Sequence, residues 1–324
     1  MSMKWYTAAF VTVLAALAVQ GAWAVANESP ASETLEEVTV TAQRIELQKR
    51  IFKFVNQIAA TENGAEGLAR WGAPPACPLV SGLSRKDGEF ILERLSEIGR
   101  LAGVPLGDEH CRPNLYILVT SQPEDLLRGM QKRNRRYTFG VDASFYPPTE
   151  TPANVVDHFI RTPRPVRVWH NITEKDAWGQ PLAYCQAPLI LPQCSEAGRN
   201  QPECDPTLRY RCDRAIAGGS HLVFNAMWSL STVFVIADQN LLHEVKLGQL
   251  ADYIAMSSFA KLKADARLED GTTILTHFNG TPTAAPPGMT AWDQTFLKSL
   301  YGTEQKSMLQ RSEIAHQMVH EIAP

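Results

Sequence analysis

The sequence predicts an α+β fold, in which a mixed β-sheet with a βαβ unit carries flanking helices and a disulfide-rich insertion. Two short apolar strands, residues 78–83 and 114–120, enclose one amphipathic helical stretch. A strand–helix–strand order of this length implies parallel pairing through a crossover. Later β-branched segments indicate at least one more strand pair. Four cysteines fall in a polar segment with little regular pattern, residues 172–217, which crosslinks would hold in place.

The first 26 residues are typical of a secretory signal peptide. Lys4 precedes an apolar run at residues 5–19, and small residues follow, so that residues 22–24 and 24–26 both fit the small-x-small cleavage rule. The run is shorter than the roughly 20 apolar residues that span a membrane. Cleavage after Ala26 would therefore leave an exported chain with no membrane span.

A leader at residues 27–44 precedes the predicted domain. After two acidic residues, valine and threonine alternate over residues 38–41, so that residues 36–42 have a strand-like pattern. From Ile45 the apolar period becomes helical, with Leu47 and Ile51 on the same stripe. A single α+β domain is therefore expected over residues 45–324.

The helix of the βαβ unit has recognisable ends. Ser84 could cap it, with Asp87 at the third helical position. Gly103 and Pro105 follow its expected end near Ala102. The apolar period places Phe90, Ile91, Leu95 and Ile98 inward and Glu93, Arg94 and Glu97 outward.

Six cysteines in an exported chain favour up to three disulfides, with buried free thiols as the alternative. Cys77 lies just before the first strand and Cys111 just before the second. Neighbouring strands lie about 4.8 Å apart, so parallel pairing would bring these two residues together as a disulfide. The remaining four would form two bridges of undetermined connectivity: Cys185, Cys194, Cys204 and Cys212.

The remaining elements follow from local patterns. Pro123 opens a helix that should run to about Lys132, where a basic run begins. That run indicates either a solvated helix end followed by a loop or an anion site. It comprises Lys132, Arg133, Arg135 and Arg136. Further elements are expected as a helix at 155–160, strands at 165–171, 221–224 and 231–237, a helix at 247–262 and one or two helices over 292–322.

Few residues suggest chemistry, and the common signatures HExxH, G-x-S-x-G, Walker A and G-x-G-x-x-G do not occur. Asp238, His243 and Asp252 could perform acid–base chemistry in a secreted hydrolase, although turn and surface roles are the commoner use of such residues. His316 and His320 have the i, i+4 spacing of a metal site. Alternatively, the two histidines lie at the C-terminal end of a helix, where they interact favourably with the negative end of the helix dipole. We expect no resident metal and no cofactor.

The most specific string in the sequence is LEEVTVTAQR, at residues 35–44. It resembles the TonB box of TonB-dependent outer-membrane receptors. The resemblance implies capture by the periplasmic protein TonB as an added edge strand, which is β-augmentation. Six residues match the motif: Glu37, Val38, Thr39, Val40, Thr41 and Ala42.

The rest of the chain does not resemble a receptor. It lacks the repeated alternation of a membrane barrel, and it ends in Ala323 and Pro324 rather than in an aromatic residue. Three segments, CPLVSGL, CRPNLYILVT and RPVRVWHN, resemble an uncharacterised exported family of proteobacteria, from which no activity follows. The TonB-box-like string is therefore either a docking segment or a chance match, in which case it is an edge strand or a disordered leader.

Composition and motifs together give a leading function and its competitors. The chain has 324 residues, is 44% hydrophobic and 20% charged, and carries a formal net charge of −3. Such values exclude collagen and long disorder and argue against nucleic acid as a partner. We expect a protein of the Gram-negative periplasm or outer-membrane periphery that binds a partner, TonB or another envelope protein, through residues 36–44. A secreted hydrolase, metal-dependent or not, is the alternative, and a purely structural envelope protein is a third.

Overall fold

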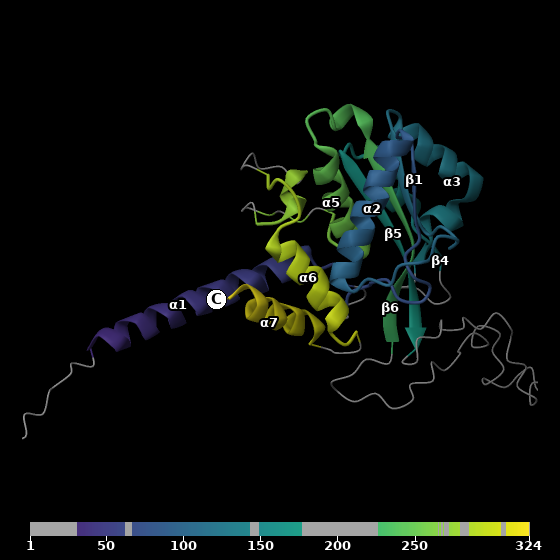
Figure 1. Cartoon of the computed structure of the whole chain (residues 1–324). Coiled ribbons are helices and arrows are strands. Elements are labelled where there is room, and N and C mark those ends of the chain that lie inside the picture. The colour runs from purple at the N-terminus through teal and green to yellow at the C-terminus, as the bar shows by residue number, and fades with distance from the viewer. Residues whose placement is uncertain are drawn as a thin grey trace, which may run out of the picture. The chain divides into compact units, whose positions relative to one another are not determined.

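The computed structural model describes residues 31–61, 67–142, 149–176, 226–264, 266, 268, 272–278, 285–305 and 309–323. The chain divides into two compact units, Met1–Gln43 and Arg44–Pro324. The sheet and all helices after α1 belong to the second unit (Figure 1). The first helix, α1 (Ala31–Ile58), begins in the first unit and ends in the second.

The main sheet has four strands in the order β1-β2-β6-β5. β1 (Pro78–Ser81), β2 (Leu115–Thr120) and β6 (Ala226–Asp238) are parallel to one another. β5 (Val166–Asp176) pairs antiparallel to β6, with a register shift between Asn171 and Ile172. The mixed sheet and the βαβ unit predicted from the sequence are thereby confirmed. A two-stranded ribbon, β3 (Val141–Asp142) with β4 (Thr149–Glu150), stands apart.

Six further helices complete the described part of the second unit, together with two short 3-10 turns. The helices are α2 (Arg85–Ala102), α3 (Pro123–Phe139), α4 (Ala153–Arg161), α5 (Leu247–Phe259), α6 (Ala291–Gly302) and α7 (Gln310–Ile322). The turns are η4 (Gln239–Leu241) and η5 (Ile274–His277). No helix of the described residues is long and apolar enough to cross a membrane.

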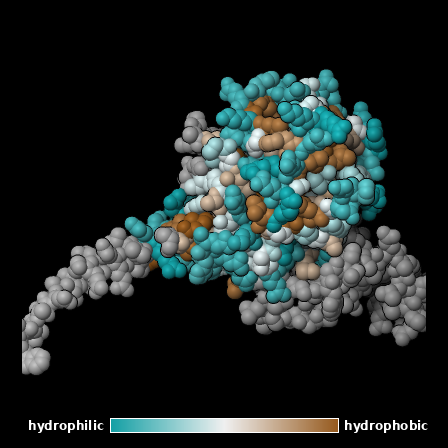
Figure 2. Space-filling view, in the orientation of Figure 1, coloured by the Kyte–Doolittle hydropathy of each residue, from teal (hydrophilic) through white to brown (hydrophobic). Residues whose placement is uncertain are grey.

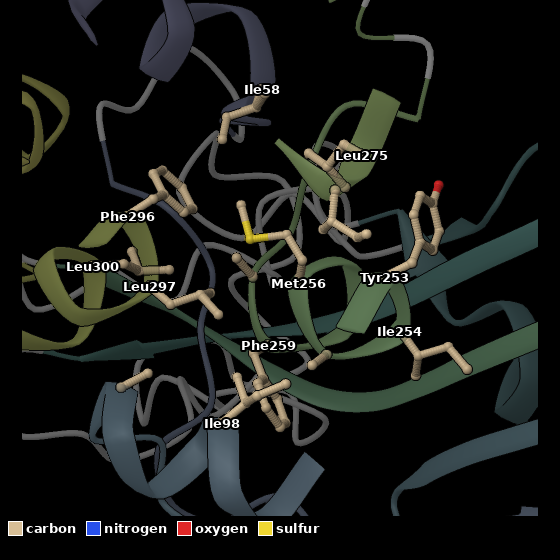
Figure 3. Packing of buried hydrophobic residues seen from close by; sticks show 14 of the residues in the cluster. Ile58, Ile98, Tyr253, Ile254, Met256, Phe259, Leu275, Phe296, Leu297 and Leu300 are labelled. Carbon is tan, nitrogen blue, oxygen red and sulfur yellow. The ribbon is translucent and has the colours of Figure 1, made fainter. Parts of the chain in front are cut away.

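Alternate side chains of the central strands supply two hydrophobic cores, one on each face of the sheet. Leu115 and Ile117 of β2 and Val235 of β6 join the larger core. That core also takes side chains from α2, α5, α6, α7 and the C-terminal part of α1. In Figure 3, Met256 of α5 lies between Phe296 of α6 and Leu275. The smaller core on the opposite face joins Phe234 and Ile236 of β6 to apolar residues of α3 and α4: Leu127, Phe139, Val156 and Ile160.

The first predicted disulfide is present. Cys77 and Cys111 are bonded, with their Cα atoms 5.9 Å apart. The register that pairs Pro78 with Leu115 brings the two cysteines to the same end of the sheet, as parallel pairing requires. Cys185, Cys194, Cys204 and Cys212 lie outside the described residues, and so do the predicted signal peptide and the strand expected at 221–224.

The caps predicted for α2 are also present. The Ser84 side chain accepts a hydrogen bond from the Asp87 backbone N–H, at 3.2 Å. Gly103 takes a left-handed conformation, with φ of 75°, and its N–H bonds the last carbonyls of the helix. Two side chains of α2 differ from the expected pattern. Phe90, expected inside, is 42% exposed. Arg94, expected outside, turns back toward α5 to pair with Asp252.

Three other expectations are corrected by the structure. Residues 36–42 lie within α1 rather than in a strand, because helix continues on both sides of them and none of the described strands pairs with them. α3 continues past Lys132 to Phe139, with a non-helical break at Asn134. β5 continues to Asp176, so residues 172–176 belong to the sheet and not to the insertion.

Candidate functional site

The carboxyl ends of parallel strands are where α/β sheets commonly bind ligands, and Asp238 lies at such an end, on β6. Its Oδ1 accepts hydrogen bonds from the backbone N–H and the side-chain amide of Asn240, both at 3.1 Å. The Asn240 amide also donates to the carbonyl of Ser121, at 2.7 Å. Asp238 therefore anchors the turn after β6 to the end of β2, which is a structural role.

Asp252 is buried in α5 and is 3% exposed. It accepts hydrogen bonds from Arg94 Nε at 2.6 Å, from Arg94 Nη2 at 3.2 Å and from the Met289 N–H at 2.6 Å. The hydrogen bond to Asp252 raises the pKa of the Arg94 guanidinium. A Cβ on Gly288 would come within 2.7 Å of Asp252 Oδ2, so this carboxylate also requires glycine there. Asp252 thus joins α2 and the segment before α6 to α5.

His243 is exposed in the loop between η4 and α5. Among the residues that the structure describes, no hydrogen bond or salt bridge joins any two of Asp238, His243 and Asp252. Each of the two aspartates has its own structural partners. The acid–base site remains a prediction from sequence that the described contacts do not support.

The histidine pair of α7 faces solvent at both positions. The His316 ring packs edge-on against Phe52 of α1, with 5.1 Å between ring centroids. Within the described ranges, no group of three or more histidine, cysteine, aspartate or glutamate side chains is arranged to hold a metal ion. His316 therefore packs its ring against α1, and His320 is exposed to solvent.

A cavity of about 350 Å³ lies between α2, α6 and α7. Charged side chains line it, but they pair with one another: Arg94 with Glu97 at 2.7 Å, and Lys298 with Glu321 at 2.8 Å. On the face seen in Figure 2, hydrophobic residues form small patches separated by hydrophilic ones. This cavity therefore lacks an unpaired charge that would select a ligand.

Residues 37–42, which match the TonB-box motif, lie in the part of α1 that belongs to the first unit. Residues 42–46 are exposed, and among the described side chains of α1 Leu47 is the first that packs against the larger core. The segment contains four consecutive β-branched residues, 38–41. Such residues lose side-chain freedom in a helix and favour strands. Its helix is therefore weakly specified by its own sequence.

Two further titratable groups have perturbed pKa values. The sequence indicates His170 as a histidine satisfied within the core, whereas sequence reasoning did not single out Asp293. His170 of β5 hydrogen-bonds the Ser257 carbonyl through Nε2, at 2.8 Å, and burial lowers its pKa to about 4. Asp293 of α6 is fully buried and accepts backbone hydrogen bonds from Ile274 and Thr290. Burial raises the pKa of Asp293. The Thr290–Asp293 capping-box spacing could have signalled this aspartate. For His170 the sequence could not give the partner, because Ser257 lies 87 positions away.

Comparison with protein-family models, with curated proteins and with solved structures finds no match for this chain. Any function must therefore be argued from the residues themselves.

Proposed function

We propose that this chain is an exported envelope protein that binds TonB through residues 36–44, which TonB captures as an added β-strand. The observation that carries the proposal is the acidic and β-branched string at residues 35–44, between the predicted signal peptide and the folded domain. The periplasm or the outer-membrane periphery of a Gram-negative bacterium is the corresponding location. The domain would then be the cargo or the effector that TonB pulls on.

Capture as a strand requires residues 36–44 to leave their helical conformation. Two features lower the free-energy cost of this conversion. Residues up to Gln43 belong to a different compact unit from the domain, and β-branched residues disfavour helix by roughly 0.5 kcal/mol each relative to alanine. The main-chain hydrogen bonds of a new strand pair would offset that cost.

Docking need not disturb the described core contacts of α1. Among its described side chains, which start at Ala42, Leu47 is the first that packs against the larger core, and it lies beyond the captured segment. Asp238 and Asp252 act within the domain as structural anchors, so their loss should change stability rather than TonB binding. Because no described contact assembles a hydrolytic site, we propose no second function.

Titration of the mature protein with the periplasmic domain of TonB tests the proposal. Three versions should be compared by calorimetry: wild type, a deletion of residues 36–44, and a matched nine-residue deletion of residues 27–35. We expect binding by wild type and by the 27–35 deletion, and no binding by the 36–44 deletion. Absence of wild-type binding, or equal binding by all three versions, would contradict the proposal.

A further inference from the structure

A second cavity, of about 430 Å³, lies at the bend of α3, over the face of the sheet that carries the smaller core. We call it the elbow pocket. Phe234 of β6 lines it from the sheet, and Leu126, Gly129, Met130 and Arg133 line it from one side of α3. Tyr137, from the part of α3 beyond the bend, also lines it. Its size is within the range of small-molecule sites, about 300–1,000 Å³.

The bend has a clear cause in Asn134. This residue leaves the helical conformation, with φ of −159° and ψ of 84°. Its side-chain oxygen then accepts a hydrogen bond from the Tyr137 N–H at 3.0 Å, as an N-cap does. The Thr138 hydroxyl donates to the Asn134 carbonyl, also at 3.0 Å. The last turn of α3 therefore starts as a new helical segment, and the cavity lies at the junction.

Two aromatic rings, Phe234 and Tyr137, line the elbow pocket, and Tyr116 packs behind them. Phe234 stacks on Tyr116 with centroids 5.1 Å apart, and Tyr137 meets Phe234 edge-on at 6.2 Å. The Tyr116 hydroxyl donates to the Pro113 carbonyl at 2.9 Å. It can therefore only accept from the Tyr137 hydroxyl, 3.0 Å away. The rings are fixed before any ligand arrives, which lowers the entropy cost of binding.

Gly129 keeps one side of the elbow pocket open. It lies in the middle of the first segment of α3, where glycine costs about 1 kcal/mol relative to alanine. No positive φ requires it, since the positive-φ glycines are Gly82, Gly103 and Gly140. A Cβ at this position would meet no described atom within 4 Å. Gly129 is exposed, so alanine would fit there as well, and only a large side chain at this position would fill the space beside the pocket.

The rim of the elbow pocket carries one basic and one acidic side chain, Arg133 and Asp125. Arg133 is exposed at the pocket, and within the described residues its guanidinium makes no salt bridge. Lys132 and Arg136 flank it in sequence and are exposed as well. The one acidic lining residue, Asp125, precedes Arg133 by eight residues, about 12 Å along a helix. The rim is therefore basic at the bend and acidic at the far end, which orients a ligand.

We propose that the elbow pocket binds a small aromatic carboxylate. Its ring would lie against Phe234 and Met130, in the space that Gly129 leaves open, because aromatic faces pack well on one another and on thioethers. Its carboxylate would pair with Arg133, whose planar guanidinium matches a carboxylate in two parallel hydrogen bonds. The basic run singled out in the sequence is then an anion site joined to an apolar cavity. This proposal is independent of TonB docking.

Calorimetric titration of the full mature chain with 2-naphthoate, and with the neutral 2-naphthamide for comparison, tests the proposal. Gly129→Trp fills the space from the helix side, and Gly129→Ala is its matched control. We expect 1:1 binding of naphthoate by wild type and by Gly129→Ala, and at least tenfold weaker binding by Gly129→Trp. Deletion of residues 36–44 should leave this binding unchanged.

Arg133→Gln separates the charge from the cavity and does not depend on how well Gly129→Trp folds. Arg133 is exposed, so this variant should keep the wild-type melting temperature. It should bind naphthoate at least tenfold more weakly and naphthamide as wild type does. No naphthoate binding by wild type, or naphthoate binding that neither Gly129→Trp nor Arg133→Gln weakens, would overturn the proposal.

Discussion

Acidification should destabilise the domain through His170. This side chain packs beside α5, where its Nε2 hydrogen-bonds the Ser257 carbonyl at 2.8 Å, and burial lowers its pKa from 6.5 to about 4. The unfolded chain then binds more protons than the folded one between these two values. Stability from His170 is therefore fully present above about pH 6.5 and is lost as the pH falls toward about 4.

The magnitude follows from the two pKa values. Between about pH 7.5 and about pH 4.5, a shift from 6.5 to about 4 changes the free energy of unfolding by about 2.5 kcal/mol. This is an upper bound, because the residue retains some contact with solvent.

Urea unfolding at both pH values measures this loss. The variant His170→Gln keeps an N–H donor for the Ser257 carbonyl but does not titrate, so its stability should fall by about 2 kcal/mol less than that of wild type. His243→Gln is the matched control for the substitution itself, because His243 is exposed. Equal losses for wild type and His170→Gln would refute the reasoning.

Three further predictions concern the core, the Arg94 pair and the leader. Asp252→Asn should lower the free energy of unfolding by about 2 kcal/mol. This is less than the roughly 3–5 kcal/mol lost when one partner of a fully buried ion pair is removed, because the Arg94 side chain is 31% exposed. An unchanged urea midpoint would contradict this prediction. Ile117→Ala in the fully buried part of β2 should cost about 2–5 kcal/mol, whereas Leu79→Ala, 38% exposed on β1, should cost less than about 1; equal costs would contradict the assigned cores. Replacing residues 39–41 by alanine should favour the helix by about 1.5 kcal/mol and weaken TonB binding roughly tenfold. As a control, exchanging β-branched residues for one another at these positions should change binding little. Tighter binding by the alanine variant would indicate that the segment docks as a helix.

Local signals determined which parts of the fold could be predicted. The strands of the βαβ unit are continuous apolar runs between turn residues, and the Cys77–Cys111 bond follows from their parallel pairing. The cap residues Ser84 and Gly103 gave the ends of α2 correctly. In each case the information lies within a few residues or in one strand pair.

Features that depend on distant parts of the chain could not be predicted. Arg94 and Asp252 are 158 positions apart, so their pairing requires the packing of α2 on α5. The elbow pocket joins α3 to Phe234 on β6, and no spacing in the sequence reports that proximity. The strand predicted at residues 36–42 was wrong for a different reason. Its β-branched alternation is a strand pattern, but a strand needs a partner, and α1 continues through these residues instead.

The conformation of residues 37–42 in the presence of TonB tests the central proposal most directly. Backbone chemical shifts of the isotope-labelled mature protein, measured with and without the periplasmic domain of TonB, report helix or strand at each residue. The account predicts helical shifts for the free chain, as α1 requires, and extended shifts in the complex, with alternate amides protected from exchange as in an edge-strand pair. Shifts that stay helical, or that do not change when TonB is added, would contradict it.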